Sequence, residues 1–312
     1  MISGKKERIQ WAEESSFGVM STNAYEVLPN AVVINDFKQN WEEVNNTGDL
    51  TYNYERGYVD VKYTLSFVVR TWRFFVMAFG DSTDVNNTTY FSHTLSEYAP
   101  LHSFTLQRIQ YDSAIGSSSR ILTYVGSKVD SITIDWNSEG GGINGSFVTI
   151  TAKCTAKRVY EETTTGTVYS FTGDIFQARM TEVKINGVTY NANLSGSITI
   201  TNNLNSGFYA DSSSSYYRSE NLPQHRRMFG EININYSNST PFDLWATGSA
   251  VSGDTYVKFS RGEHDWFKID MTGKMFLNSV PDNTNLDGLN ILKFDFRVGG
   301  EPTITAEDAY EW

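Results

Sequence analysis

Three adjacent residues, Glu263-His264-Asp265, are the best candidates in this sequence for binding a metal ion. Zinc sites usually take ligands roughly two to four residues apart on a turn, or one turn apart on a helix. Neighbouring residues on a strand point to opposite faces of a sheet, so three in a row rarely share one ion. The spacing therefore favours a polar turn over a zinc site.

A glycine-rich segment, residues 140–145, matches the G-x-G-x-x-G spacing of dinucleotide-binding loops. Dinucleotide binding also needs a helix directly after the glycines, because the helix N-terminus meets the pyrophosphate. The next residues, 146–151, read as a strand instead. We therefore expect a hairpin turn at 140–145 and no bound dinucleotide.

Acidic residues give only weak signals for catalysis or calcium binding. The pairs Glu13-Glu14, Glu42-Glu43 and Glu161-Glu162 fall in expected loops, whereas a glycosidase needs two carboxylates across one cleft. Residues 282–288 are rich in Asp and Asn but lack the bidentate Glu of an EF-hand. We expect a polar hairpin loop there.

The remaining reactive side chains have no partners at a useful spacing. His93, His102 and His225 are expected in loops or on the surface, and no G-x-S-x-G sequence supports a serine hydrolase. Cys154 is the only cysteine and lies in an expected strand, which favours a buried thiol over a reactive one. We expect no catalytic, cofactor-binding or metal-binding residues, and a protein that is not an enzyme.

The composition indicates a soluble β-rich chain. Of 312 residues, 39% are hydrophobic and 14% aromatic, and aromatic rings suit the pleated faces of sheets. The net charge is −11 without a Lys/Arg cluster, which argues against tight nucleic-acid binding but not against passive contact with DNA. There is no apolar segment of a secretory signal, and the longest apolar run, 67–79, is interrupted by Arg70 and Arg73. We therefore expect no membrane span.

One arrangement occurs twice: an alternating strand, a short helix and a stop at glycine. The first copy covers 59–67 and an apolar helical stripe up to Gly80; the second covers 232–236 and 241–247 up to Gly248. The two stops lie 248 − 80 = 168 residues apart, just over half the chain. The pattern predicts a mostly β protein with two similar β-sandwich or half-barrel units, each with a short flanking helix. Convergent β composition is the alternative.

These signals predict three segments. Residues 1–18 are expected to form an extended N-terminal arm, 19–160 a first β unit and 161–312 a second. The polar run 161–166 is the expected boundary between the units. The segment 206–227 is long, polar and rich in Tyr, which is typical of a functional loop.

Three stretches in order resemble the tail tube proteins of long-tailed bacterial and archaeal viruses. Residues 8–18 end in Glu14-Ser15-Ser16-Phe17-Gly18, similar to the family's opening E-x-[ST]-[FY]-G signature. The other two stretches are the core strands from Ser103 to Lys153 and the segment from Phe171 to Leu204. Each motif is degenerate, but the ordered set is much more specific.

The resemblance implies a structural subunit that closes into rings, with stacked rings forming the channel for viral DNA. It implies a virion tail location, assembly in the host cytoplasm, and contacts with tape measure, tail terminator and baseplate or tip proteins. If the chain is duplicated, three chains give a ring with pseudo-sixfold symmetry; otherwise six chains are needed. We expect residues 1–18 and 206–227 to make ring-to-ring contacts, and the negative charge to give an acidic channel that repels phosphates.

Two other functions stay open from the sequence. A carbohydrate-binding or adhesive β-sandwich would use exposed Tyr and Trp rings to stack on sugars. A β-sandwich hydrolase, the weaker alternative, would require clustered carboxylates in a cleft.

Overall fold

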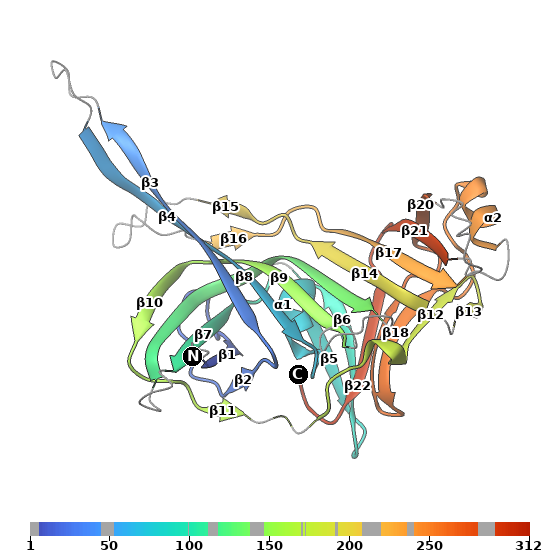
Figure 1. The fold of residues 1–312 in the computed structure, drawn as a ribbon, viewed down its shortest axis with the longest axis horizontal. Helices are drawn as coiled ribbons and strands as arrows, with labels where there is room; N and C mark the ends of the chain where they lie inside the picture. The colour runs from blue at the N-terminus through green and yellow to red at the C-terminus, as the bar shows by residue number, and fades with distance from the viewer. Residues whose placement is uncertain are drawn as a thin grey trace, which may run out of the picture.

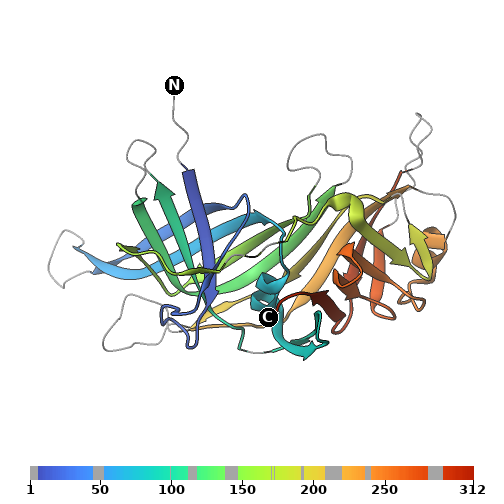
Figure 2. The same cartoon turned by 90° about the horizontal axis from the view of Figure 1, so that it is seen from below.

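The computed structural model shows a mostly β protein built from two large sheets (Figures 1 and 2). It describes residues 6–44, 53–98, 100–111, 118–137, 147–169, 171, 173–190, 193–207, 220–235, 240–279 and 291–312. The expected fold class is confirmed as mostly β and sandwich-like. Segments 140–145 and 282–288 lie outside the described residues.

Eight strands of the larger sheet follow one another in a line that we call the long row. In spatial order they are β3 (Val32–Val44), β4 (Asn53–Val68), β9 (Thr149–Ala156), β8 (Ser118–Asn137), β14 (Asn193–Thr201), β17 (Arg227–Asn235), β21 (Ile291–Val298) and β20 (Met275–Ser279). Every neighbouring pair in the long row is antiparallel.

The long row branches at β8. The N-terminal part of β8 also pairs with two strands outside the row, β7 and β10. The branch strands are β7 (Phe104–Tyr111), β10 (Arg158–Glu162), β1 (Lys6–Glu13), β2 (Tyr25–Val27) and β11 (Val168–Tyr169). A small separate pair joins β15 (Asn205–Gly207) to β16 (Glu220–Leu222).

The second sheet packs against the long row and mixes strands from both predicted units. Its spatial order is β13 (Val188–Tyr190), β12 (Thr181–Ile185), β18 (Tyr256–Gly262), β19 (Asp265–Asp270), β22 (Thr303–Asp308), β6 (Phe91–Glu97) and β5 (Gly80–Asn86). Strands on either side of residue 160 thus pair in both sheets, as β8 with β14 and β6 with β22. The division of the chain at 160 stays a prediction.

Aromatic side chains fill the space between the two sheets. Trp72 stacks on Phe267 of β19 with ring centroids 4.1 Å apart. Trp136 of β8 meets Phe259 of β18 edge-on at 5.5 Å. All four rings are buried, so both sheets turn their apolar faces to one core, as the alternation in β4 requires.

The two predicted helices exist, but they end in different ways. The first is short, with η1 (Arg73–Phe75) leading into α1 (Val76–Phe79). The second is α2 (Thr240–Thr247), followed by Gly248 in the left-handed conformation that often ends a helix, at φ 63°. Gly80 instead has φ 153° and ψ −111°, and a Cβ there would collide with the backbone of Ser96 and Tyr98. A further single turn is η2 (Ala178–Met180).

The predicted N-terminal arm is wrong for residues 6–13, which form a core strand. β1 pairs with β7 over its whole length, from Lys6 with Tyr111 to Glu13 with Phe104. Ile9 and Trp11 are both 2% exposed. Their apolar side chains point into the core at alternate positions, and this burial holds the segment in the sheet.

Beyond β1, the Glu14 carboxylate ties three parts of the chain together. Its Oε2 accepts hydrogen bonds from the Gly18 amide at 3.0 Å and the Ser103 hydroxyl at 2.8 Å. Its Oε1 accepts from the Thr105 hydroxyl and the Gly126 amide, both at 2.8 Å. Because Glu14 is buried, all four donors depend on this one side chain.

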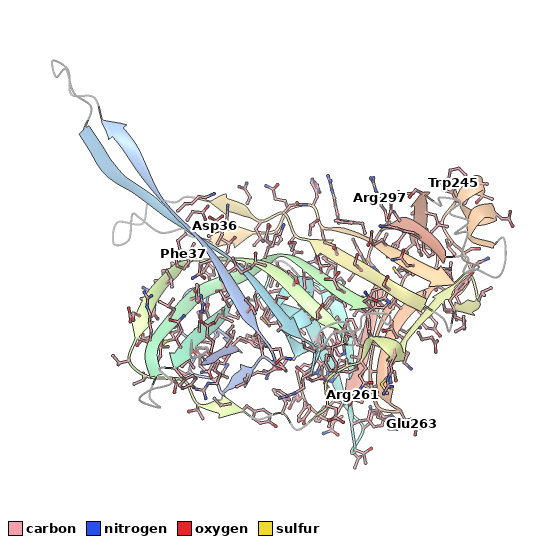
Figure 3. The ribbon with its side chains drawn as sticks, in the orientation of Figure 1. Asp36, Phe37, Trp245, Arg261, Glu263 and Arg297 are labelled. Carbon is pink, nitrogen blue, oxygen red and sulfur yellow. The ribbon has the colours of Figure 1, made fainter. Side chains whose placement is uncertain are left out.

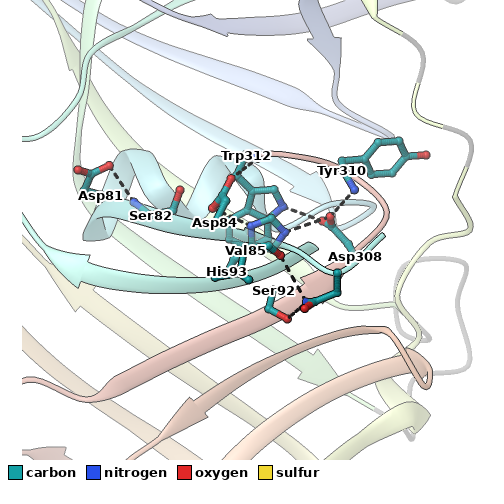
Figure 4. Close-up of polar contacts among 10 residues, drawn as sticks. Asp81, Ser82, Asp84, Val85, Ser92, His93, Asp308, Tyr310 and Trp312 are labelled. Carbon is teal, nitrogen blue, oxygen red and sulfur yellow. Dashed lines mark hydrogen bonds and ion pairs between the residues drawn. The ribbon is translucent and has the colours of Figure 1, made fainter. Parts of the chain in front are cut away.

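A second polar cluster, the His93 clasp, fastens the end of the described chain to the second sheet (Figure 4). His93 Nδ1 lies 2.9 Å from Asp84 Oδ1, and Nε2 lies 3.2 Å from Asp308 Oδ1. Trp312 stacks on the imidazole at 4.1 Å, its backbone amide donates to Asp84, and its indole N–H donates to Asp308. His93 is 1% exposed, so its expected place in a loop or on the surface is wrong.

The charge of His93 determines what the clasp contributes to stability. Burial alone would lower the pKa of His93, but the hydrogen bonds to Asp308 and Asp84 outweigh it and raise the pKa above 6.5. The protonated ring donates to both carboxylates. A histidine whose pKa is higher in the folded state stabilises the fold fully at pH values below its pKa in the unfolded chain. This contribution is lost as the pH rises through its pKa in the folded protein.

We predict that Glu14→Ala lowers the free energy of unfolding by about 2–4 kcal/mol, because it leaves buried donors without an acceptor. Urea unfolding followed by Trp fluorescence measures this. Ser15→Ala, a change at the exposed neighbour, is the control and should shift the value by less than about 0.5 kcal/mol. Equal stability of the two variants would contradict the role of Glu14.

We also predict that the stability gap between wild type and His93→Gln is largest below pH 6.5 and shrinks as the pH rises above the native pKa of His93. Urea unfolding between pH 5 and pH 9 tests this. His225→Gln, at an exposed side chain, controls for general effects of losing a histidine. A gap that is constant across this range would show that His93 acts only by packing.

Candidate assembly surfaces

The long row consists of two four-stranded groups with the same strand order. The first group contains β3, β4, β9 and β8, and the second contains β14, β17, β21 and β20. In both, the strands lie in the order first, second, fourth and third along the chain. In both, the second strand leads into a helix, α1 or α2, and that helix contacts the third strand, β8 or β20.

The two groups join where β8 pairs with β14. Register pairs run from Asn137 with Ser195 to Ser131 with Thr201. On the outer face, the hydroxyls of Thr133 and Thr199 lie 2.9 Å apart. On the core side, the buried Asn202 amide donates to the backbone carbonyls of Ala78 at 2.8 Å and Val129 at 2.9 Å. The second group therefore holds the end of α1 as well as the β8 backbone.

Within the described residues, each end of the long row is an edge strand that pairs on one side only. β3 pairs with β4 alone, and β20 pairs with β21 alone. Apolar side chains on these edges face outward: Val32 is 53% exposed, Ile34 66% and Phe276 40%. Open edges with exposed apolar residues are templates for another strand. These edges are therefore the strongest candidate interaction sites of the protein.

A two-stranded ribbon, the arm hairpin, projects from the body next to one of these edges (Figures 1 and 3). β4 pairs with β9 only from Val61 onward, whereas its pairing with β3 continues out to Asn53 with Val44. In the part of the chain that the structure describes, residues 38–44 and 53–60 therefore pair only with each other. Asp36 and Phe37 lie at the base of the arm hairpin, and Trp245 lies at the opposite end of the molecule (Figure 3).

The outer face of the long row carries charges of both signs. Lys62 lies 3.0 Å from Asp60, and Lys293 lies 2.7 Å from Glu231. The register pairs of neighbouring strands place these described charged residues on this face: Asp36, Lys38, Asp60, Lys62, Asp135, Lys153, Arg227, Glu231, Lys293, Asp295 and Arg297. This part of the face is mixed in charge, not acidic.

The candidate metal ligands sit in the turn between β18 and β19 and point to separate partners. Asp265 pairs with Arg261 at 2.5 Å, while His264 lies 2.9 Å from Glu307 and stacks on Tyr90. Burial raises the pKa of Asp265. Figure 3 labels Arg261 and Glu263 at this turn. No group of three possible metal ligands occurs among the residues the structure describes.

The other predicted chemistry candidates are scattered. Glu13 contacts His102 at 2.6 Å, Glu161 contacts Arg120 at 3.5 Å, and Glu42 and Glu43 belong to the arm hairpin. Cys154 is buried, and desolvation raises the pKa of its thiol far above the ordinary value. Its predicted burial is confirmed. The described helices include none long and apolar enough to cross a membrane.

Two half-buried aromatic rings on the second sheet, Tyr256 and Trp266, are covered by lysines. Lys268 lies over Tyr256 at 4.3 Å, and Lys258 lies over Trp266 at 4.7 Å. A sugar-binding surface needs open ring faces, and cation–π contacts of this kind occupy them. These two rings therefore do not form a stacking platform.

Sequence reasoning missed both edge strands and the arm hairpin. The apolar residues Val32 and Ile34 are exposed in the structure, but a sequence does not show which strands lack a second neighbour. The charged residues of 36–43 were an available signal, since charges are common on edge strands.

Comparison with known proteins identifies the family of this chain. A family model described as phage tail tube protein matches residues 4–306. No curated protein matches the chain. Because the family match covers nearly the whole sequence, the chain belongs to the phage tail tube protein family.

Proposed function

We propose that this protein is the ring-forming subunit of a virus tail tube, with stacked rings enclosing the channel for DNA. Family membership supports the structural role. The observation that carries the ring is the long row, whose two open edges lie at its opposite ends. Open edge strands make a monomer prone to aggregate. When the chains close into a ring, the unpaired N–H and C=O groups of these edges find partners.

We infer that three chains complete one ring. The two groups of the long row share their strand order and helix position, so each chain supplies two similar β units. Three chains then give six similar positions, a ring with pseudo-sixfold symmetry. A ring of six chains is the alternative and would contain twelve groups.

The arm hairpin is our candidate for ring-to-ring contacts, in place of residues 1–18. A two-stranded ribbon is marginally stable by itself in water, and residues 38–44 and 53–60 pair only with each other. A neighbouring subunit would supply the missing contacts. The pair β15 and β16 projects from the second group in the corresponding place, between its first and second strands, so part of segment 206–227 is proposed to act similarly.

Surface charges that already form ion pairs with each other suit a channel through which DNA moves without binding. We propose that the outer face of the long row lines the channel. Its lysines at 62 and 293 already contact carboxylates, so they would lose an ion pair on binding phosphate, and Ser and Thr occupy much of the remaining face. The mechanism we propose is charge pairing and not net negative charge. Assembly in the host cytoplasm and contacts with tape measure, terminator and baseplate or tip proteins belong to the same proposal.

The purified protein is predicted to form rings or tubes in negative-stain electron micrographs, with three chains per ring by native mass spectrometry. A carbohydrate-binding module would instead stay monomeric and gain thermal stability from glycans. Six chains per ring would overturn the inferred stoichiometry, and a monomer at all concentrations would overturn the function.

Replacing residues 41–56 with an Asn-Gly turn is predicted to leave rings intact but to abolish long tubes. The change removes the outer part of the arm hairpin, leaving only residues 38–40 and 57–60 of it, and keeps the part of β3 that pairs inside the sheet. The matched control replaces residues 87–90, the turn between β5 and β6, with the same Asn-Gly dipeptide and should leave tubes normal. Tubes of ordinary length from the arm variant would exclude the arm hairpin from stacking.

A further inference from the structure

A buried carboxyl group on β2, that of Glu26, lies where three parts of the chain meet. Glu26 is 4% exposed and faces Trp11 of β1 on one side and Tyr169 of β11 on the other. Its Oε1 accepts a hydrogen bond from the Thr71 hydroxyl at 2.6 Å, just before η1. We propose that Glu26 is a proton-operated latch, which holds β2 and β11 against the segment leading into α1 while its carboxyl is neutral and releases them when it ionises.

The hydrogen bonds of Glu26 suit a neutral acid. Its Oε2 is buried and has no hydrogen-bond partner among the residues that the structure describes. Glu14, which is also buried, accepts four hydrogen bonds on its two oxygens. A buried carboxylate needs such donors to replace the water that it loses, whereas a protonated carboxyl needs fewer. The surroundings of Glu26 therefore favour the protonated side chain.

Charges on two neighbouring elements act on Glu26 in opposite directions. Burial has the largest effect and raises the pKa of Glu26 from 4.5 to about 7. The hydrogen bond from Thr71 and the positive charge of Arg73 in η1 lower this pKa, as does the nearby Trp11 indole to a smaller extent. The negative charge of Asp308 in β22 raises it. The carboxyl therefore changes its charge near neutral pH.

The elements that Glu26 holds have few other attachments. β2 has three residues and two register pairs with β1, and β11 has two residues and pairs with β2 alone among the described strands. β11 belongs to the crossover segment, residues 163–177 between β10 and η2. Tyr169 and Phe171 of this segment contact the Tyr310 ring at 6.4 and 4.6 Å, and the Tyr310 amide donates to Asp308 (Figure 4). Release of β2 would therefore loosen the crossover segment as well.

The direction of the response follows from proton binding. Between pH 4.5 and about 7, the closed protein keeps the Glu26 proton that the locally open form loses, so a rising pH favours opening. Above about pH 7 the closed form ionises too, and the loss of stability is complete. The latch is thus closed at about pH 5 and loosened at about pH 8.

Hydrogen–deuterium exchange of the full chain, followed by mass spectrometry of peptides that cover β2 and β11, tests the latch. Wild type and Glu26→Gln are compared at each pH, so the intrinsic pH dependence of exchange cancels. The ratio of wild-type to variant exchange is expected to rise roughly 50- to 100-fold between pH 5 and pH 8.5. Glu263→Gln, at an exposed carboxyl, is the matched control and should follow wild type throughout. A ratio that stays constant over this range would overturn the latch.

Thr71→Val and Arg73→Gln provide a second readout, the pH at which the opening is complete. Each change removes a group that favours the ionised carboxyl, so Glu26 should keep its proton to a higher pH. Exchange in β2 and β11, corrected for its intrinsic rate, is then expected to level off at a higher pH than in wild type. Arg297→Gln, at an exposed arginine of β21, should leave that pH unchanged. The same levelling pH in all four proteins would show that Glu26 is not the group that responds.

The His93 clasp must be separated from the latch, because both lose stability as the pH rises. The comparison is therefore repeated with His93→Gln in both proteins. The rise in the exchange ratio is expected to persist in this background, and its disappearance would assign the response to the clasp and overturn the latch. Rings can form whether or not the latch exists, so none of these outcomes bears on the proposed function.

Discussion

The hydrogen-bonding capacity of strand edges is the constraint on which this architecture depends. Each strand carries unpaired N–H and C=O groups on both sides until a neighbour satisfies them. Inside the chain, β8 and β14 satisfy each other and fuse two groups of strands into one long row. At its ends, β3 and β20 each have one side without a partner among the strands that the structure describes. One rule therefore explains both the cohesion of the subunit and its tendency to associate.

Local pattern predicted those parts of the fold that depend on short stretches of sequence. Alternation in 59–67 gave a strand with Val61, Tyr63, Leu65 and Phe67 buried, as the structure has it. Pro241 and Gly248 marked α2 within one residue. An Asn-Gly dipeptide is a strong signal for a tight turn because few residues accept positive φ, and Asn186-Gly187 forms such a turn with φ 51° and 81°.

Long-range pairing could not be predicted in the same way. Nothing near Ser131 or Thr201 specifies that these residues face each other across the sheet, because register depends on the packing of the entire core. The N-terminal segment shows this clearly: 6–13 looks like a short mixed arm until β7 supplies a partner for each residue. His93 likewise gained its role from residues nine and 215 positions away.

Strand length also sets how the protein responds to force. β8 has 20 residues and pairs along its length with four different strands. Tension along β8 acts in shear, so many perpendicular hydrogen bonds carry the load together. β20 has only five residues and, among the described strands, a single partner strand. Under tension, we expect the strands in the interior of the long row to stay paired while β20, at its edge, detaches first.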